Sequence, residues 1–349
     1  QFFEVSEFQK IALSRILIFP FQIYYVALLA FVSFFVLNRT VLGKQILAVG
    51  GNEKASNLTG IPTKRIRLFV YGFSGFCCSI AGLNSIAMNS AADAMWMGYL
   101  IELDAIAAVV IGGTLLSGGK ATIIGTILGA FIIQLVGYTL IGNGVPDAVV
   151  LISKGLLIII SVWLQKNNWI KMFNFKFSAP LAATLALVLI LIFAGLRYPG
   201  FLGSYNILTV LQYNSMFCLI SIGMCFVIMT GGIDLSVGTV AALGSVFAAI
   251  LSPYGIVLGV LGGILIGFLA GFINGLVITS CGMCNLNTKD KRCNLSIKIG
   301  DKIFDVDGTK INEHGDEHGE IGFCNAVRVA WAKGKIIKEI FYAESFSLV

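Results

Sequence analysis

The sequence predicts an all-α polytopic membrane protein with about nine transmembrane helices, followed by a small C-terminal α+β or β-rich domain that contains cysteines. Hydrophobic residues make up 57% of the chain, charged residues only 12%, and the mean hydropathy is +0.89, values far outside those of soluble domains. Apolar segments of about 20 residues recur along the chain. The basic residues behind the net charge of +6 lie between these segments, which is typical of cytoplasmic loops, so no nucleic-acid partner is expected.

Eight apolar segments are long enough to cross a bilayer, and a ninth is shorter. The shorter segment, residues 105–116, is either a full crossing or a re-entrant segment. Basic residues place segments 39–67 and 166–176 in the cytoplasm, whereas Glu102 and Asp104 are expected near the outer mouth. If the ninth segment crosses, the N-terminus lies outside and the chain after residue 279 lies inside. The eight long segments are residues 19–37, 68–86, 121–141, 148–164, 180–196, 207–229, 235–251 and 256–279.

Glycines recur at every fourth position from Gly255 to Gly275, inside an uncharged apolar segment. Four residues are slightly more than one α-helical turn, so these glycines form a stripe along one helix face. Within lipid, such a face lets two backbones approach closely. We expect the stripe to pack against the crossing at residues 207–229. The predicted packing residues are Gly259, Gly263, Gly267 and Gly271.

Asp234 lies between two long apolar segments and follows Gly231 and Gly232. A carboxylate at the centre of a bilayer costs roughly 2.5 to 3.5 kcal/mol on insertion scales, so it should face protein, water or backbone donors. The two glycines permit a break in the helix. Two readings remain open: Asp234 lies on the path of a substrate, or it caps the start of the next crossing.

Four segments of the sequence resemble the permease subunits of ribose-type sugar ABC importers. MTGGIDLSVGTVAALGSVFAAI (residues 229–250) and GFLAGFINGLVIT (residues 267–279) resemble their N-terminal half. NRTVLGKQILAVGGNEKASNLTGIPTKRIRLFVYGFSG and ELDAIAAVVIGGTLLSGGKATIIGTILGA resemble their C-terminal half, which here comes first. The chain therefore resembles the end of one permease joined to the start of another, as in galactofuranose-type systems that encode two permeases.

This resemblance divides the chain into four parts. Residues 1–165 resemble the C-terminal half of a permease, residues 166–179 form a cytoplasmic linker, residues 180–280 resemble the N-terminal half, and residues 281–349 form a small domain with Cys and His. Competing readings are a fused or truncated fragment without transport activity and a membrane-anchored metal-binding or redox protein that acts through its tail.

The resemblance implies a multi-pass protein of the bacterial inner membrane that forms part of the import pathway for a monosaccharide of the ribose or galactofuranose class. It implies three protein partners within the lipid bilayer or beside it: a cytoplasmic ABC ATPase, a periplasmic sugar-binding protein and a second permease subunit. ATP hydrolysis would belong to the ATPase, so the chain is not expected to be an enzyme. The membrane part is expected to need no cofactor, since GTLLSGGK at residues 113–120 lacks the spacing of a phosphate-binding loop.

The cytoplasmic segment from Arg39 to Arg67 matches a block of the same permeases and is the expected docking surface for the ATPase. Its glycines allow tight turns. The alternative is that the segment has no docking role and that its basic residues only keep it on the cytoplasmic side of the membrane. The candidate docking residues are Gly50, Gly51, Asn52 and Gly60.

The polar tail after residue 280 resembles a small uncharacterised Cys-rich domain of bacterial proteins. Its segment LSIKIGDKIFDVDGT predicts a β-hairpin with its turn at residues 300–301. Thiolates and imidazoles are the ligands of tetrahedral zinc sites, and disulfides or free thiols are the alternatives. The candidate ligands are Cys281, Cys284, Cys293 and Cys324, with His314 and His318 as weaker candidates.

Overall fold

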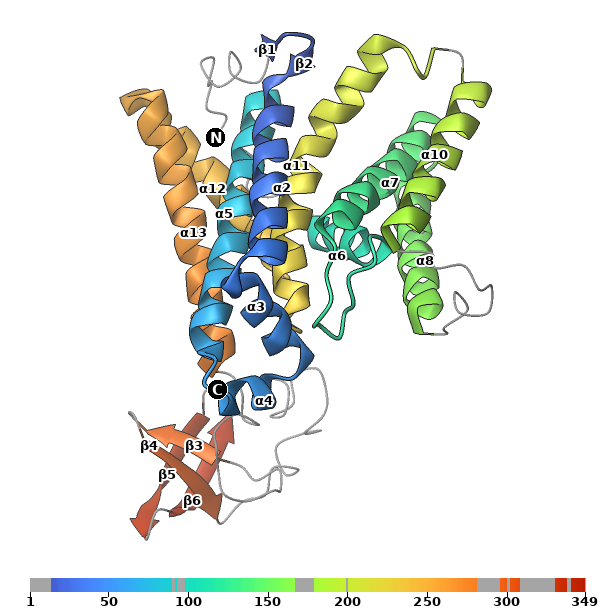
Figure 1. Ribbon diagram of the computed structural model, residues 1–349. Helices are drawn as coiled ribbons and strands as arrows, with labels where there is room; N and C mark the ends of the chain where they lie inside the picture. Colours follow the sequence, from blue (N-terminus) through green and yellow to red (C-terminus); the bar gives the residue numbers. More distant parts are fainter. Residues whose placement is uncertain are drawn as a thin grey trace. The chain divides into compact units, whose positions relative to one another are not determined.

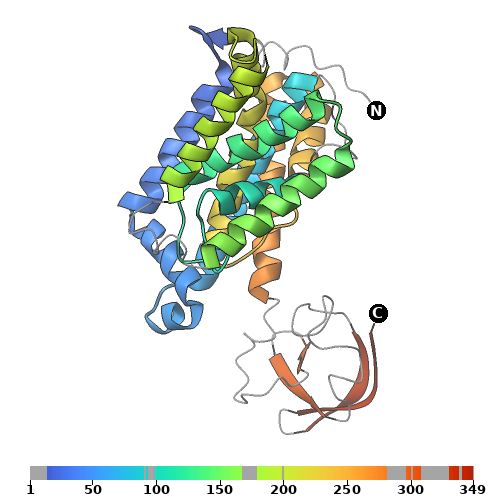
Figure 2. The ribbon, with the colours of Figure 1, turned by 90° about the vertical axis from the view of Figure 1, so that its right-hand side faces the viewer.

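A computed structural model describes residues 14–89, 92, 98, 100–166, 179–198 and 200–280, together with four strands of the tail. The chain forms two compact units, Gln1–Gly275 and Leu276–Val349 (Figures 1 and 2). The described part of the first is helical apart from a short hairpin near its start. The second is described through its strands.

The helical unit confirms the predicted fold class. Seven of the described helices are long and apolar enough to cross a membrane: α2, α5, α7, α10, α11, α12 with its short extension η1, and α13. Helix α8 has 20 residues and α6 only 11. The elements are β1 (Arg15–Ile16), β2 (Phe19–Pro20), α2 (Phe21–Arg39), α3 (Val41–Gly51), α4 (Glu53–Leu58), α5 (Thr63–Asn89), α6 (Ile101–Ile111), α7 (Ile123–Gly142), α8 (Asp147–Lys166), α10 (Ala179–Arg197), α11 (Ser204–Met229), α12 (Val237–Leu251), η1 (Ser252–Tyr254) and α13 (Ile256–Ser280).

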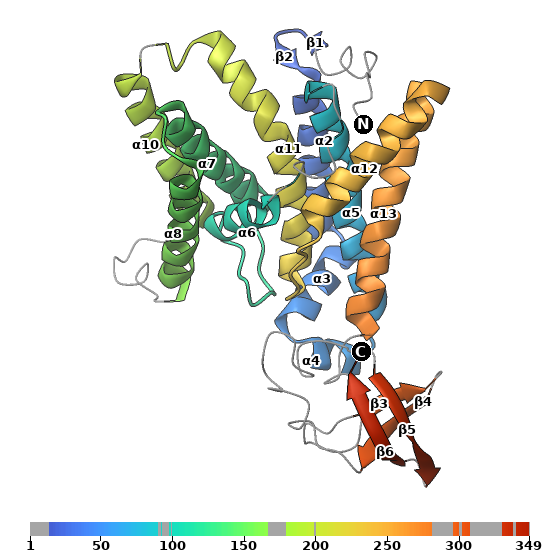
Figure 3. The same cartoon turned by 180° about the vertical axis from the view of Figure 1, so that it is seen from behind.

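Helices α5 and α11 form the centre of this unit and are its most buried spans. They lie side by side in Figures 1 and 3. Gly223 of α11 permits the close approach, because a β-carbon there would lie 3.0 Å from Cα of Ser74 and 3.1 Å from Cβ of Cys77. The rings of Phe73 and Phe226 pack across the interface with their centroids 4.6 Å apart. The four cysteines of the two helices are buried free thiols: Cys77, Cys78, Cys218 and Cys225.

The glycine stripe of α13 packs against α5, so the partner predicted from the sequence, the crossing at residues 207–229, is wrong. A β-carbon at Gly267 would overlap Oγ of Ser79, and one at Gly271 would overlap the carbonyl oxygen of Tyr71. The physical reason is complementarity: α5 offers Gly75 and Ser79 four residues apart, so both helices present small residues at the same spacing.

Helix α6 settles the question left open for residues 105–116. Its 11 residues span about 16 Å, roughly half of the 30 Å hydrocarbon core. It is therefore not a full-length transmembrane helix. It lies against α7 at two backbone contacts, since a β-carbon at Gly125 would overlap the carbonyl oxygen of Gly112 and one at Gly129 would overlap that of Ala108.

The second unit contains one four-stranded sheet in the order β3-β4-β6-β5. Strands β3 (Ser296–Ile299) and β4 (Lys302–Asp307) pair in antiparallel fashion with Ile299 opposite Lys302, which agrees with the predicted hairpin turn at residues 300–301. β4 pairs in parallel with β6 (Ile340–Leu348), and β6 pairs in antiparallel fashion with β5 (Ala330–Ile337). The candidate zinc ligands Cys281, Cys284, Cys293, Cys324, His314 and His318 lie outside the described residues.

Candidate functional site

Three segments far apart in the sequence meet at what we name the glycine junction, formed by Gly50, Gly118, Gly119, Met229 and Gly231. The amide of Gly119 donates a hydrogen bond to the carbonyl oxygen of Met229 over 2.9 Å. A β-carbon at Gly50 would overlap that same oxygen and lie 2.7 Å from the amide nitrogen of Gly119. The main chains of the α3 end, the α6–α7 loop and the α11 end therefore touch directly.

Backbone conformation as well as space requires glycine at the junction. Gly118, Gly119 and Gly231 have φ angles of +80°, +75° and +80°, a region that costs glycine little and other residues more. The α6–α7 loop is closed on itself, because the amide of Leu115 donates to the carbonyl oxygen of Lys120 over 3.2 Å. The sequence GTLLSGGK thus forms a turn whose Gly119 amide already binds protein backbone.

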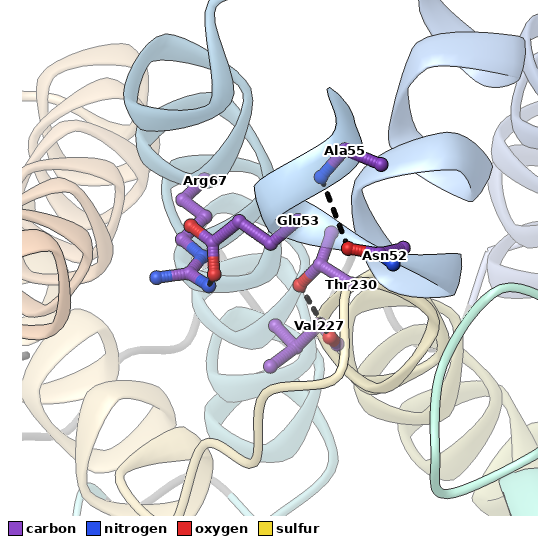
Figure 4. Close-up of polar contacts among 6 residues, drawn as sticks. All are labelled: Asn52, Glu53, Ala55, Arg67, Val227 and Thr230. Carbon is purple, nitrogen blue, oxygen red and sulfur yellow. Dashed lines mark hydrogen bonds and ion pairs between the residues drawn. The ribbon is translucent and has the colours of Figure 1, made fainter. Parts of the chain in front are cut away.

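Residues 40–60, expected as a cytoplasmic loop, form two short helices. Thr40 caps α3 by accepting from the amide of Gly43, and Asn52 caps α4 by accepting from the amide of Ala55 over 3.0 Å (Figure 4). Side-chain oxygens at these positions satisfy amides that a helix start leaves unpaired. The predicted docking segment is therefore a folded pair of helices.

An ion pair between Glu53 and Arg67 ties α4 to the start of α5 (Figure 4). Glu53 and Arg67 are 14 positions apart in the sequence, so local sequence patterns do not reveal this contact. Of the four candidate docking residues, Gly51, Asn52 and Gly60 are exposed, whereas Gly50 points into the glycine junction. The set therefore divides into a surface part and an internal part.

Asp234 organises the turn that leads from α11 to α12. Its side chain is 5% exposed, and Oδ1 accepts hydrogen bonds from the amide and the hydroxyl of Ser236 over 3.0 and 2.6 Å. Nδ2 of Asn274 in α13 donates to Oγ of Ser236 over 2.6 Å. Gly232 lies under Tyr71, whose hydroxyl oxygen would be 2.5 Å from a β-carbon at that position. These contacts belong to a structured helix break; a contact with substrate stays a prediction.

Asp104, which the sequence predicted near the outer mouth, is a largely buried residue of a helix. It is in the first turn of α6, and its Oδ2 accepts a hydrogen bond from Nζ of Lys154 in α8 over 2.6 Å. Sequence reasoning missed Lys154, the single cation between Asp147 and Lys166 in a helix of 20 residues. That isolation was the available signal, since a charge within an apolar helix needs a partner.

Comparison with known proteins finds family models that match two parts of the chain. Residues 2–162 match the family described as branched-chain amino acid transport system / permease component. The resemblance to importer permeases is confirmed. Residues 276–349 match a family of unknown function, DUF6370, so the permease-like part and the tail match separate families.

The permease-like part has relatives among sugar importers. The chain is 38% identical over 155 residues to the ribose import permease protein of Haemophilus influenzae, which is 44% of this chain and 48% of the relative. It is 38% identical over 150 residues to the ribose import permease protein of Escherichia coli K12, and 35% identical over 153 residues to the xylose transport system permease protein of Haemophilus influenzae. These alignments cover 43% and 44% of this chain and 46% and 40% of the relatives.

The chain spans about half the length of the curated relatives it matches. No solved structure matches it. The permease relatives and the seven helices able to cross a membrane confirm the predicted location, a multi-pass protein of the bacterial inner membrane.

Proposed function

We propose that this chain is a pathway-forming permease component of an ABC importer for a monosaccharide of the ribose or galactofuranose class. The glycine junction carries the proposal. It joins the exposed helices α3 and α4 through main-chain contact to the end of α11, where the helix breaks before Asp234. A partner that binds α3 and α4 would thereby act directly on a transmembrane helix. The names of the relatives, ribose and xylose permeases, support the substrate class.

The partners in this proposal are a cytoplasmic ATPase, a periplasmic sugar-binding protein and a second permease subunit. ATP hydrolysis is assigned to the ATPase. In support of this assignment, the amide of Gly119 in the GTLLSGGK turn binds Met229 and is not free to cradle a phosphate. The membrane part needs no cofactor in this scheme.

The docking surface consists of Gly51, Asn52, Gly60 and Leu58, all exposed around α4. Leu58 is 90% exposed at the end of α4. A leucine so exposed on a capped and ion-paired helix suits a protein partner with an apolar pocket, because apolar anchors supply much of the energy of such interfaces. Glu53 and Arg67 hold the helix that presents it.

Replacement of this leucine tests the docking surface. Leu58→Glu should abolish or strongly reduce co-purification of the importer's ATPase, because a carboxylate cannot enter an apolar pocket. Leu17→Glu is the matched control, since Leu17 is 92% exposed in the turn between β1 and β2. Recovery in the membrane fraction should be equal for both. Equal co-purification by the two variants would exclude docking through α4, whereas absence of the ATPase from the purified parent protein would favour a fragment without transport activity.

For the tail we propose a structural cysteine cluster, held either by zinc or by disulfides, from Cys281, Cys284, Cys293 and Cys324. The motif Cys-x-x-Cys at residues 281–284 supports it. A zinc-bound tail should lose protease resistance when zinc is chelated, and a cross-linked tail only when it is reduced. Zinc content of purified protein, compared between the parent and Cys281→Ser, separates the two. Protease resistance that survives both treatments would contradict the cluster.

A further inference from the structure

The charged pair Asp104 and Lys154 lies inside the helical unit and plays no part in the proposed docking. Nζ of Lys154 is 2.6 Å from Oδ2 of Asp104, and the two side chains are 16% and 13% exposed. Two opposite charges taken out of water gain little or nothing over an apolar pair of similar size. Stability alone therefore gives no reason for this pair, and a positional role is the better-founded expectation.

Three helices contribute to this contact: two supply the charged residues and the third leaves space for the lysine side chain. Asp104 comes from α6 and Lys154 from α8, and Figure 2 shows α8 in front of α6 and α7. The stem of Lys154 passes over Gly137 of α7, where a β-carbon would lie 3.2 Å from Cε of the lysine. Glycine at residue 137 thus leaves the space that the lysine side chain needs to reach α6.

Helix α6 requires a contact that holds it in position. It is preceded by Leu100 with φ +56° and followed by Gly113 with φ +89°, so non-helical joints lie at both ends. Against α7 it presents backbone and small residues, Ala108 and Gly112, so no large side chain of α6 interlocks at these two contacts. The hydrogen bond from Lys154 ties α6 to α8.

The first turn of α6 lies against the first turn of α12. A β-carbon at Gly238 would overlap the carbonyl oxygen of Gly98 and lie 3.0 Å from Cγ2 of Ile101 and 3.2 Å from Oε2 of Glu102. Asp104 is half a turn beyond Glu102 on the same short helix. Whatever fixes Asp104 therefore also fixes the carboxylate of Glu102 at the start of α12.

We propose that the Asp104–Lys154 ion pair positions α6, holding Glu102 and the first α6 turn at the start of α12. The two residues are positioning residues, because they act through the placement of α6. The effect of this ion pair on transport rests on the proposed permease function. Its effect on the position of residue 102 is independent of that function.

The test measures how fast Glu102→Cys reacts with a maleimide in the full chain in lipid nanodiscs, by mass spectrometry of the peptide that contains residue 102. Three backgrounds are compared: the parent pair, the apolar pair Asp104→Leu with Lys154→Met, and the exchanged pair Asp104→Lys with Lys154→Asp. The apolar pair should fold as stably as the parent, because replacing both ions avoids an unpaired charge. Labelling should change at least fivefold in the apolar pair and return toward the parent rate in the exchanged pair.

Glu53→Gln is the matched control, since it breaks the ion pair with Arg67 on α5 and should leave labelling at residue 102 unchanged. Equal labelling in all three backgrounds would overturn the inference. If labelling changes in the apolar pair and sugar uptake by the assembled importer does not, the positioning role stands and its link to transport fails. Folding of each variant is checked by its thermal unfolding, so that a loss of structure is not read as a change of position.

Discussion

The glycine stripe of α13 and the glycine junction both depend on missing side chains, yet they differ in what glycine supplies. In the stripe, Gly263, Gly267 and Gly271 lie within a regular helix and supply only space against α5 and α12. In the junction, Gly118 and Gly119 supply space together with positive φ angles. A helix that meets a larger residue can shift sideways, whereas a hydrogen-bonded contact between main chains cannot, so the two regions should respond differently to the same added methyl group.

The largest effect is expected at Gly50, where the comparison can be made between neighbours. Gly50→Ala places its β-carbon on the carbonyl oxygen of Met229, a main-chain atom that cannot rotate away. Gly51→Ala meets nothing within 4 Å. We expect Gly50→Ala to lower the free energy of unfolding by about 3 kcal/mol and Gly51→Ala to change it by less than about 0.5 kcal/mol. Unfolding in mixed lipid and detergent micelles measures both, and equal stabilities would contradict the junction.

An intermediate effect is expected in the stripe. Gly271→Leu must push α13 away from Tyr71 and Gly75 of α5, and overpacking of this kind costs about 1 to 3 kcal/mol. Gly155→Leu in α8 is the matched control, because a β-carbon at Gly155 has nothing within 4 Å. Thermal unfolding in lipid nanodiscs should separate the two variants. If Gly271→Leu lowers the free energy of unfolding more than Gly50→Ala does, the proposed difference between the two regions is wrong.

The smallest effect is expected at the hydrogen bond that connects α13, which carries the stripe, to the turn between α11 and α12, which follows the junction. Asn274 lies on α13 beside the stripe, and its amide donates to Ser236, which also binds Asp234. Asn274→Ala should cost about 1 kcal/mol, the usual net value of one hydrogen bond. Asn38→Ala removes an exposed amide that bonds only to its own helix and should cost less. A double-mutant cycle with Ser236→Ala measures the coupling, and a coupling of zero would show that α13 and the turn before α12 are independent.

The sequence was sufficient for the helices, because stretches of about 20 apolar residues have few alternatives to a transmembrane helix. The sequence did not predict which helices pack against one another. The stripe of α13 was visible in the sequence, but its match to Gly75 and Ser79 depends on which helices become neighbours. The length of α6 was ambiguous for a similar reason, since hydropathy alone does not separate a short helix from a full crossing.

The site followed the same pattern. Gly50 and Gly231 stood out in the sequence as a docking candidate and as part of a helix break, and their convergence with Gly118 and Gly119 is a tertiary fact that no local period encodes. The Asp104–Lys154 pair joins residues 50 positions apart, so neither residue predicts the other. The zinc ligands proposed for the tail stay a prediction, since they lie outside the described residues.

The contact between Gly119 and Met229 has a chemical consequence beyond its geometry. An amide and a carbonyl group carry no titratable proton and no net charge. Its strength should therefore be constant across the pH range in which proteins stay folded, and from low to high ionic strength. The ion pair of Glu53 and Arg67 is weakened by salt, so a rise in ionic strength would loosen the hold on α4 while the junction stayed as strong as before.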